Sequence, residues 1–327
     1  MKAFVKNVFA VFLLSTAVVY SYKNYFSLLS YVEDSQTITF PTFDIPVQAS
    51  AIGSSAKIIF VGDMMFDRSI RGKTNKFGGD YVFSCIKDTL SGADLVVANL
   101  EGPITPYESI SVGSIPGEPN NYVFTFPTST GETLFNNNIK LVNLGNNHIL
   151  NFGYGGVVST KEYLDKAGVR YFGDPEGVRV ANEEVNGISF SFINYNEFSK
   201  EGDNAASTTI DQIIAYKKMG RLPIVFTHWG VEYATSSNEY QRYLGHLFVD
   251  SGAVLVIGTH PHVVEESEVY KGVPIYYSLG NFIFDQYFSD EVKNGEIVEV
   301  GFNNFRVKDI KESKVYLNKD GKTCLNK

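Results

Sequence analysis

Thiolate ligands are scarce in this sequence of 327 residues, which has only two cysteines, Cys85 and Cys324. This scarcity argues against a closed structural zinc site. In an exported protein the two cysteines could form a disulfide, but the sequence does not show whether they meet. A chain of this length can bury enough apolar surface to fold without that bond.

Positive charge is also in short supply. Lysine and arginine together number 28 against 36 aspartates and glutamates, which gives a formal net charge of −8. This balance argues against a nucleic-acid partner that is bound through phosphate contacts. An anionic substrate would be repelled at long range, so a site for one needs local positive charge, which a bound metal ion would supply. Internal repeats and low-complexity tracts are missing as well.

Apolar sequence, by contrast, is sufficient for a substantial core, at 44% hydrophobic and 14% aromatic residues. The N-terminus places Lys2 and Lys6 before an apolar run at 8–20, and Lys23 follows it. This order predicts a signal-anchor or transmembrane segment at 1–25, with the folded domain extracytoplasmic and held to the cell membrane by a single N-terminal helix. A cleaved export signal and a buried structural helix are the alternatives. Residues 26–56 lack a clear period and are predicted to be a linker.

The rest of the chain alternates short apolar runs with segments of helical spacing, so we expect a layered α/β domain over residues 57–310. Helices are predicted at 81–90, 157–167, 210–219 and 240–249. The last of these contains His246, which we interpret as an ordinary helix residue. The stretch 104–127 is predicted to be a long loop near Glu101, and 311–327 to be a polar, Lys-rich tail.

Polar side chains end the apolar runs. Five runs are followed closely by Asp, Asn, Glu or His, and the residues concerned are Asp63, Asn99, Glu101, Asn147, His148, His228, His260 and His262. Single members of this set could be turn residues. Together they predict strands that deliver ligands to one edge of a sheet. Because strand side chains alternate, His260 and His262 should leave the backbone on the same side.

Imidazole, carboxylate and amide oxygen together suit Mn²⁺, Zn²⁺ or Fe. Such an ion could polarise a phosphoryl or carbonyl oxygen and generate hydroxide from water near neutral pH. The sequence therefore predicts a divalent metal site with hydrolytic chemistry.

Several motifs, in their order along the chain, resemble the CapA family of poly-γ-glutamate capsule synthesis proteins. They are Gly62-Asp63-Met64-Met65, Asn99-Leu100-Glu101-Gly102-Pro103, Asn146-Asn147-His148, His228-Trp229-Gly230-Val231-Glu232, Thr259-His260-Pro261-His262-Val263 and the run 277–286. The resemblance covers residues from about Lys57 to Gln286. It implies a calcineurin-like metallophosphoesterase fold, which is a two-sheet β-sandwich flanked by helices. It also implies an extracytoplasmic protein that takes part in making or exporting an anionic γ-linked glutamate polymer.

That wider fold normally holds two metals, and this chain departs from its pattern. Met65 stands where a ligand histidine would be expected, and the bridging aspartate is absent, which leaves Asn99 and Glu101 as candidates. The resemblance assigns one metal to Asn147, His228 and His260, whereas Asp63 and His262 remain from the other half. We therefore expect one firmly held metal and a second that is weak or missing.

Further roles follow from the same resemblance. His148 matches the residue that protonates a leaving group. Arg68 is predicted either to bind a substrate carboxylate or to pair with Asp67 or another acid as scaffold. Glu232 is a candidate partner of a ligand histidine, and Asn281 is expected to stabilise the turn after Gly280.

Three functions remain open on this evidence. The first is a metal-dependent hydrolase-like enzyme that acts on an anionic polymer such as poly-γ-glutamate, alongside membrane-bound synthetase subunits. The second is a non-catalytic component that uses a metal-organised cleft to bind or guide the polymer. The third is a phosphodiesterase.

Overall fold

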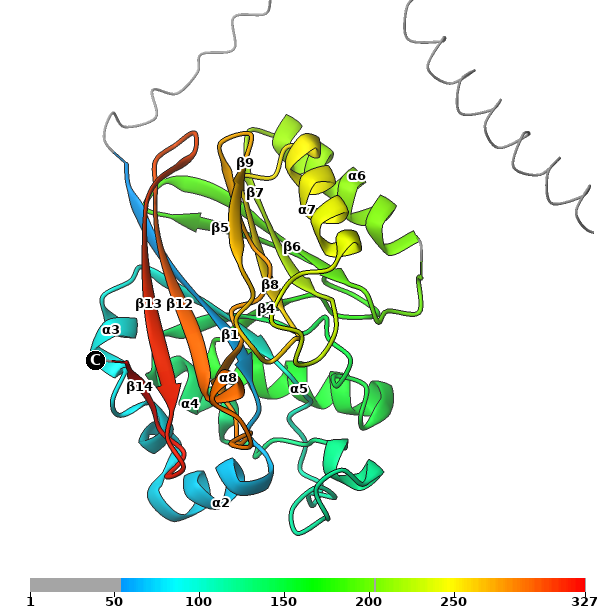
Figure 1. Ribbon diagram of the computed structural model, residues 1–327, viewed down its shortest axis with the longest axis vertical. Helices are drawn as coiled ribbons and strands as arrows, with labels where there is room; N and C mark the ends of the chain where they lie inside the picture. The colour runs from blue at the N-terminus through cyan, green and yellow to red at the C-terminus, as the bar shows by residue number, and fades with distance from the viewer. Residues whose placement is uncertain (1–53, 203, 327) are drawn as a thin grey trace, which may run out of the picture. The chain divides into compact units, whose positions relative to one another are not determined.

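The computed structural model describes residues 54–202 and 204–326, which form a mixed α/β fold with two β-sheets (Figure 1). The first sheet has the order β14-β13-β12-β1-β2-β3-β4, and β11 also pairs with β1. Its strands are β1 (Ala56–Met64), β2 (Leu95–Leu100), β3 (Ile139–Asn143), β4 (Arg170–Phe172), β11 (Asn281–Ile283), β12 (Asn294–Phe302), β13 (Val307–Leu317) and β14 (Thr323–Leu325).

The second sheet has the order β5-β6-β7-β8-β10-β9. Its strands are β5 (Val180–Val185), β6 (Ile188–Asn196), β7 (Leu222–His228), β8 (Leu255–Thr259), β9 (Ser267–Tyr270) and β10 (Val273–Tyr276). The α-helices are α2 (Arg68–Phe77), α3 (Lys87–Ser91), α4 (Thr130–Asn136), α5 (Gly153–Ala167), α6 (Asn204–Lys218), α7 (Glu239–Ser251) and α8 (Asp290–Lys293). Two 3₁₀ helices, η2 (Gly79–Phe83) and η3 (Pro119–Tyr122), complete the described elements.

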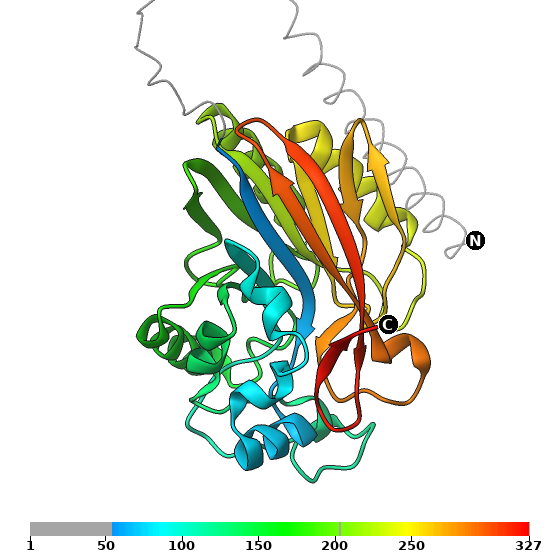
Figure 2. The same cartoon turned by 90° about the vertical axis from the view of Figure 1, so that its left-hand side faces the viewer.

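The layers follow from strand alternation. On β1, Ile58 and Phe60 face the second sheet, where they join a core with Phe192 and Phe226. The intervening Ile59 and Val61 face the opposite way, into the core formed with α2–α5. A third core lies between the second sheet and α6 and α7. The two sheets therefore pack face to face with helices on both outer sides, an arrangement that Figures 1 and 2 show from two directions.

The predicted strands around the polar residues are confirmed as β1, β2, β3, β7 and β8. In the first sheet β1, β2 and β3 run parallel, and in the second β6, β7 and β8 do. Their carboxyl ends therefore form one edge in each sheet. The helices at 157–167, 210–219 and 240–249 correspond to α5, α6 and α7.

One short segment joins the two sheet edges. The backbone N–H of Asp63 donates to Gly280 O (3.0 Å), and the N–H of Leu279 donates to Gly258 O (3.0 Å). This approach requires glycine at two places: a Cβ on Gly62 would lie 1.8 Å from Gly280 O, and one on Gly258 would lie 1.9 Å from Tyr277 O. Segment 277–281 therefore fixes the end of β1 beside the end of β8.

Two predicted elements were wrong. The helix at 81–90 is instead the 3₁₀ helix η2 followed by the separate α3. Its buried residues, Val82, Phe83, Ile86 and Leu90, have helical spacing although the backbone is not continuous. The tail at 311–327 is also mostly ordered sheet, because β13 extends to Leu317 and β14 follows it. The domain therefore continues beyond residue 310.

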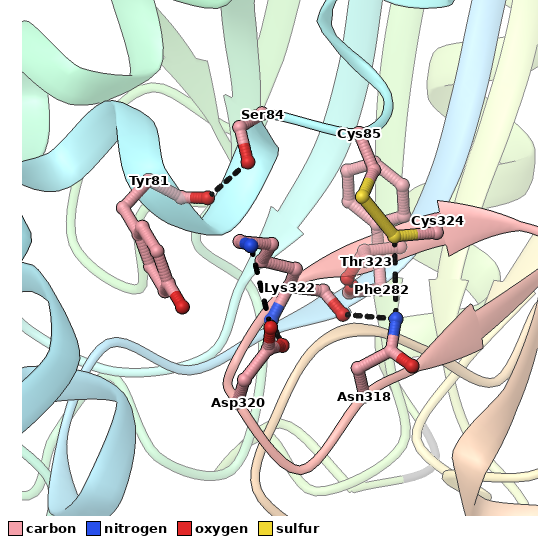
Figure 3. Close-up of a disulfide and its surroundings, with 9 residues drawn as sticks. All are labelled: Tyr81, Ser84, Cys85, Phe282, Asn318, Asp320, Lys322, Thr323 and Cys324. Atoms are coloured by element: carbon pink, nitrogen blue, oxygen red, sulfur yellow. Dashed lines mark hydrogen bonds and ion pairs between the residues drawn. A yellow bond between two sulfur atoms is a disulfide. The ribbon is translucent and has the colours of Figure 1, made fainter.

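The two cysteines are bonded to each other. Cys85 and Cys324 form a disulfide with a Cα–Cα distance of 4.9 Å across 239 residues of sequence (Figure 3). The neighbouring Thr323 hydroxyl donates to Phe282 O, which ties β14 to β11. The disulfide holds β14 against the segment that follows η2.

The signal-anchor predicted at 1–25 lies outside the described residues, as does the linker up to residue 53. Within 54–202 and 204–326, no helix is both long and apolar enough to span a membrane.

Candidate metal centre

The structure brings the predicted ligands together at the joined sheet edges. Asp63 lies near the end of β1, Glu101 directly follows β2, and His228 ends β7. His260 directly follows β8, and His262 lies two residues further on. All five side chains are buried. Residues that are far apart in the sequence thus meet between the two sheets.

These side chains form two donor groups that share one carboxylate. Glu101, His228 and His260 make one group, and Asp63, Glu101 and His262 make the other. Within each group the ligand atoms lie within 4.8 Å of one another. Glu101 belongs to both donor groups, so of the two candidates that the sequence left open it is the one that two ions could share.

Glu101 is the most unusual residue of the cluster. It is 0% exposed, and neither carboxylate oxygen has a hydrogen-bond partner among the described residues. Burial, and after it the charge of Asp63, raises the pKa of Glu101 well above its usual range. A buried carboxylate without a partner costs free energy that a cation bound beside it would recover.

Hydrogen bonds fix the tautomer of His228. Its Nδ1 lies 3.0 Å from Thr259 Oγ1, and that hydroxyl donates its own proton to Thr227 O (2.7 Å). The hydroxyl can therefore only accept from His228, which favours a proton on Nδ1, the tautomer that leaves Nε2 free for a cation. The lone pair of Nε2 then faces Asn147 Oδ1 at 3.0 Å and Glu101 Oε1 at 4.0 Å.

His262 is oriented in the same way from the other side. Its Nδ1 lies 3.0 Å from Asn281 Oδ1, while Asn281 Nδ2 has three acceptors within hydrogen-bond distance for its two hydrogens, one of which is His262 O. Nδ1 is therefore the protonated nitrogen, and Nε2 faces Glu101 Oε1 at 3.5 Å. Both histidines turn an unprotonated nitrogen toward the same carboxylate, an arrangement that a cation would stabilise.

His260 reaches the cluster through an unusual backbone. Its φ is +100° and that of His262 is +59°, so both residues lie in the region that favours glycine. The predicted reason for their convergence, strand alternation, was therefore wrong, because β8 ends at Thr259. His260 Nδ1 is buried without a partner among the described residues. Strained backbone of this kind is typical of ligand clamps.

Burial favours the neutral form of two histidines of the cluster, His228 and His260. It lowers the pKa of His228 well below the usual value, and it lowers the pKa of His260 to about 3. Neutral imidazoles are the form that binds metals. Three histidines, two carboxylates and the Asn147 amide oxygen fit a divalent ion of the Zn²⁺, Mn²⁺ or Fe type.

Amide side chains hold Asp63 in place. Asn99 Nδ2 donates to Asp63 Oδ1 (2.8 Å), and Asn143 Nδ2 donates to Asn99 Oδ1 (3.1 Å). Asn194 Nδ2 donates in turn to Asn143 Oδ1 (2.9 Å). This chain of amides directs its donors at Asp63, so Asn99 is a positioning residue.

Met65, which stands where a ligand histidine was expected, is engaged locally. Its sulfur accepts from Asp67 N (2.9 Å) at a turn after β1. The thioether is therefore part of the backbone turn rather than of the donor cluster.

His148 lies beside the cluster in the loop after β3. Its Nδ1 lies 3.1 Å from Asn151 Oδ1, an oxygen that also accepts from Phe124 N. The rings of His148 and Phe124 are 4.4 Å apart. Burial lowers the pKa of His148 to about 4. Its role in proton transfer stays a prediction.

The remaining predicted residues have different outcomes. Arg68 pairs with Asp285 (2.5 Å), so the scaffold alternative describes its observed contacts, while Asp67 pairs with Arg71. Glu232 is exposed, and among the described residues no hydrogen bond joins it to a histidine. That partnership belongs instead to Asn281 and Thr259.

Two cavities have a lining residue in contact with a histidine of the cluster. The larger, of about 780 Å³, contains Arg68 and Tyr233, whose ring lies 6.1 Å from that of His262. The smaller, of about 230 Å³, contains Asn147 and Phe198, whose ring lies 4.2 Å from that of His260. We call the smaller cavity the amide pocket. Its polar lining includes Asn147, Asn194, Asn196, Lys200, Thr208 and Gln212.

Some of these functional residues were missed by sequence reasoning. Thr259 stands inside a recognised motif, and its position before His260 was the available signal. Asn143 and Asn146 ended an apolar run but were not assigned. The lining of the amide pocket from β6 and α6 had no local signal, because those residues come together only in the fold.

The fold and the cluster together define a layered two-sheet α/β protein with a buried candidate metal centre. A family model described as "Bacterial capsule synthesis protein PGA_cap" matches residues 57–286. The chain belongs to this family, which confirms the predicted resemblance.

Individual relatives agree with this assignment. The chain is 31% identical over 243 residues to "PGA biosynthesis protein CapA" of Bacillus subtilis (strain 168), which covers 69% of this chain and 63% of that protein. It is 28% identical over 245 residues to "Capsule biosynthesis protein CapA" of Bacillus anthracis, and the alignment covers 69% of this chain and 59% of that protein. The chain thus spans about three fifths of the length of these curated relatives.

A solved structure supports the fold alone. The crystal structure of a hypothetical protein from Thermus thermophilus aligns with a TM-score of 0.51 and 18% identity, covering 79% of this chain and 98% of that one.

Proposed function

We propose that this protein acts outside the cytoplasm in the synthesis or export of a γ-linked polyglutamate capsule, as a membrane-anchored, metal-dependent hydrolase with a metallophosphoesterase-like site. The single observation that supports a bound metal most strongly is the state of Glu101. Its side chain is fully buried, neither oxygen has a hydrogen-bond partner among the described residues, and it belongs to both donor groups. The family and the names of its relatives support the polymer.

The donor set indicates an unequal pair of metal positions. Glu101, His228 and His260, with Asn147 beside His228, offer four donors for one ion. The other half has only Asp63 and His262 besides the shared Glu101. Both oxygens of Asp63 also accept hydrogen bonds, from Asn99 and from the backbone of His260. We therefore propose one firmly held ion and a weaker second one.

A bound divalent ion would supply Lewis acidity and a hydroxide nucleophile near neutral pH. The protein supplies orientation: Thr259 and Asn281 fix two imidazoles, and Asn99 fixes Asp63. The buried walls restrict water. His148 is the residue proposed to exchange a proton with the leaving group.

A non-catalytic polymer guide is the second candidate. The observation that favours it is Met65, whose sulfur is engaged with Asp67 N and offers no ligand for a hard cation. A centre with one weak half could bind carboxylates of the polymer without turning it over. A phosphodiesterase is the third candidate, and the missing ligand at Met65 counts against it as well.

The disulfide supports the extracytoplasmic location. Cys85 and Cys324 are bonded, and structural disulfides persist mainly in oxidising compartments. The proposed anchor at 1–25 would keep the domain near membrane-bound synthetase subunits.

The test uses the purified full-length chain, loaded with Mn²⁺ or Zn²⁺ and supplied with γ-linked glutamate oligomers or with a phosphodiester. Metal-dependent cleavage of the oligomers, lost in His148→Ala with metal content unchanged, is the expected result. Binding without cleavage would establish the guide instead. Cleavage of the phosphodiester alone, or no metal bound at all, would overturn the proposal.

A further inference from the structure

Three polar side chains that line the amide pocket have donors that no contact among the described residues uses. The amide nitrogen of Asn196, the Gln212 amide and the Thr208 hydroxyl have no hydrogen-bond partner among the described residues. Thr208 and Gln212 are one helical turn apart on α6 and face the same cavity. These groups could bind the C=O and N–H of an amide directly.

Among the charged residues of 54–202 and 204–326 that face the pocket, Lys200 is the one without an acidic partner. Arg179 is neutralised by a two-pronged pair with Glu201, and Asp174 is paired with Lys161 (2.7 Å). Lys200 has no acidic partner among the described residues, and its Nζ lies 3.4 Å from Tyr154 OH. In a chain of net charge −8, an ammonium group at a cavity wall favours an anionic ligand group.

The aromatic residues of the pocket are already engaged. Lys200 Nζ lies over the Tyr154 ring, 5.4 Å from its centroid. The Phe198 ring packs on the rings of His260 and His228, at 4.2 and 5.8 Å. Neither ring presents a free platform of the kind on which a sugar would stack. An amide-linked unit with a carboxylate therefore matches the lining better than a pyranose does.

The volume and the position of the amide pocket also suit one small unit. A volume of about 230 Å³ is below the roughly 300–1,000 Å³ of pockets for drug-sized ligands, so it suits one small unit. Asn147 belongs both to this lining and to the donor set beside His228. A unit held here is therefore adjacent to the candidate metal centre.

We propose that the amide pocket is a subsite for a single carboxylate-bearing, amide-linked unit, in which Lys200 pairs with the carboxylate and Asn196, Thr208 and Gln212 bind the amide. This inference rests on the proposed function, because it identifies the unit as one γ-linked glutamate of the polymer.

The experiment measures calorimetric binding of a γ-glutamyl trimer to the metal-loaded full-length chain and to variants. Lys200→Gln should weaken binding about tenfold, the value of one charge-assisted hydrogen bond. Lys218→Gln is the matched control, because Lys218 is an exposed lysine in the last turn of α6, beyond the pocket. Gln212→Leu should weaken binding several-fold. Metal content should be the same in all four proteins, since none of these residues is in the donor groups.

The outcomes separate this inference from the proposed function. If wild type binds the trimer but Lys200→Gln binds as the Lys218→Gln control does, the subsite is wrong and the polymer function survives. If wild type does not bind the trimer at all, both fail. Binding of a neutral hexose trisaccharide that is sensitive to Gln212→Leu but not to Lys200→Gln would overturn the subsite in favour of a sugar.

Discussion

Replacing Glu101 by glutamine should separate metal binding from folding stability. Glutamine has the same shape but no charge, and its amide can donate to His262 Nε2, which lies 3.5 Å from the carboxylate oxygen. In the metal-free protein, the substitution replaces a fully buried carboxyl group that has two unpartnered oxygens and a pKa raised by burial. A buried polar group left unsatisfied costs about 1–3 kcal/mol, and more when it is charged.

The expected result is therefore a gain of about 1–3 kcal/mol in the free energy of unfolding of metal-free protein. For a domain of this size that corresponds to a rise of about 2–10 °C in Tm. Scanning calorimetry after dialysis against a chelator measures it. Elemental analysis of the same samples after metal loading should show less than one ion per chain, because both donor groups lose their shared ligand.

Glu265→Gln is the matched control. Glu265 is also buried, with one unpartnered oxygen and a pKa raised by burial to about 7, but it belongs to neither donor group. Its substitution should stabilise the fold and leave metal content unchanged. A Glu101→Gln protein that is less stable without metal than wild type, or that binds as much metal, would refute the reasoning.

Thr259→Val should weaken metal affinity about tenfold or more, because it removes the hydroxyl that accepts from His228 Nδ1. Metal titration measures this affinity, and the control Thr227→Val, which is equally buried, should bind metal as the wild type does. Reduction of the Cys85–Cys324 disulfide should lower the free energy of unfolding by about 3–5 kcal/mol. Dithiothreitol should therefore lower the Tm of the wild type but not that of the Cys85→Ala/Cys324→Ala variant. Burial raises the pKa of Glu296 to about 7 from 4.5, so the folded state holds the extra proton and stability falls as pH rises through that window. Glu296→Gln should flatten this slope in pH-dependent unfolding, and an unchanged slope would count against the assignment.

Much of the site could be predicted because its strands are short, apolar and buried on both faces. Such runs identify parallel strands, and the polar residue after each run marks the sheet edge. Asp63, Glu101 and His228 were found in this way, and each lies in the cluster. What the pattern could not give is the meeting of the two edges, which depends on the contacts of segment 277–281 with Gly62 and Gly258.

Other features were out of reach for specific reasons. β13 exposes Lys308, Lys311 and Lys314 and buries only residues near its end, such as Val315. Lysines along such a strand protect an exposed sheet face, but in sequence they resemble a solvated tail. The tautomers of the histidines depend on Thr259 and Asn281, whose contacts are set by tertiary structure. The convergence of His260 and His262 depends on positive φ values, which β-branched and aromatic patterns do not encode.

The shared carboxylate also gives a physical reason for the proposed difference between the two metal positions. An ion placed between His228 and His260 would neutralise Glu101, the one charge that both donor groups use. The second group would then retain a single carboxylate, Asp63, whose oxygens already accept from Asn99 and from the His260 backbone. A second cation would meet a weaker ligand field and the repulsion of the first ion at short range. Two donor groups of three residues each are therefore compatible with one tightly bound ion, because the charge that they share adds to the difference in donor number that Asn147 makes.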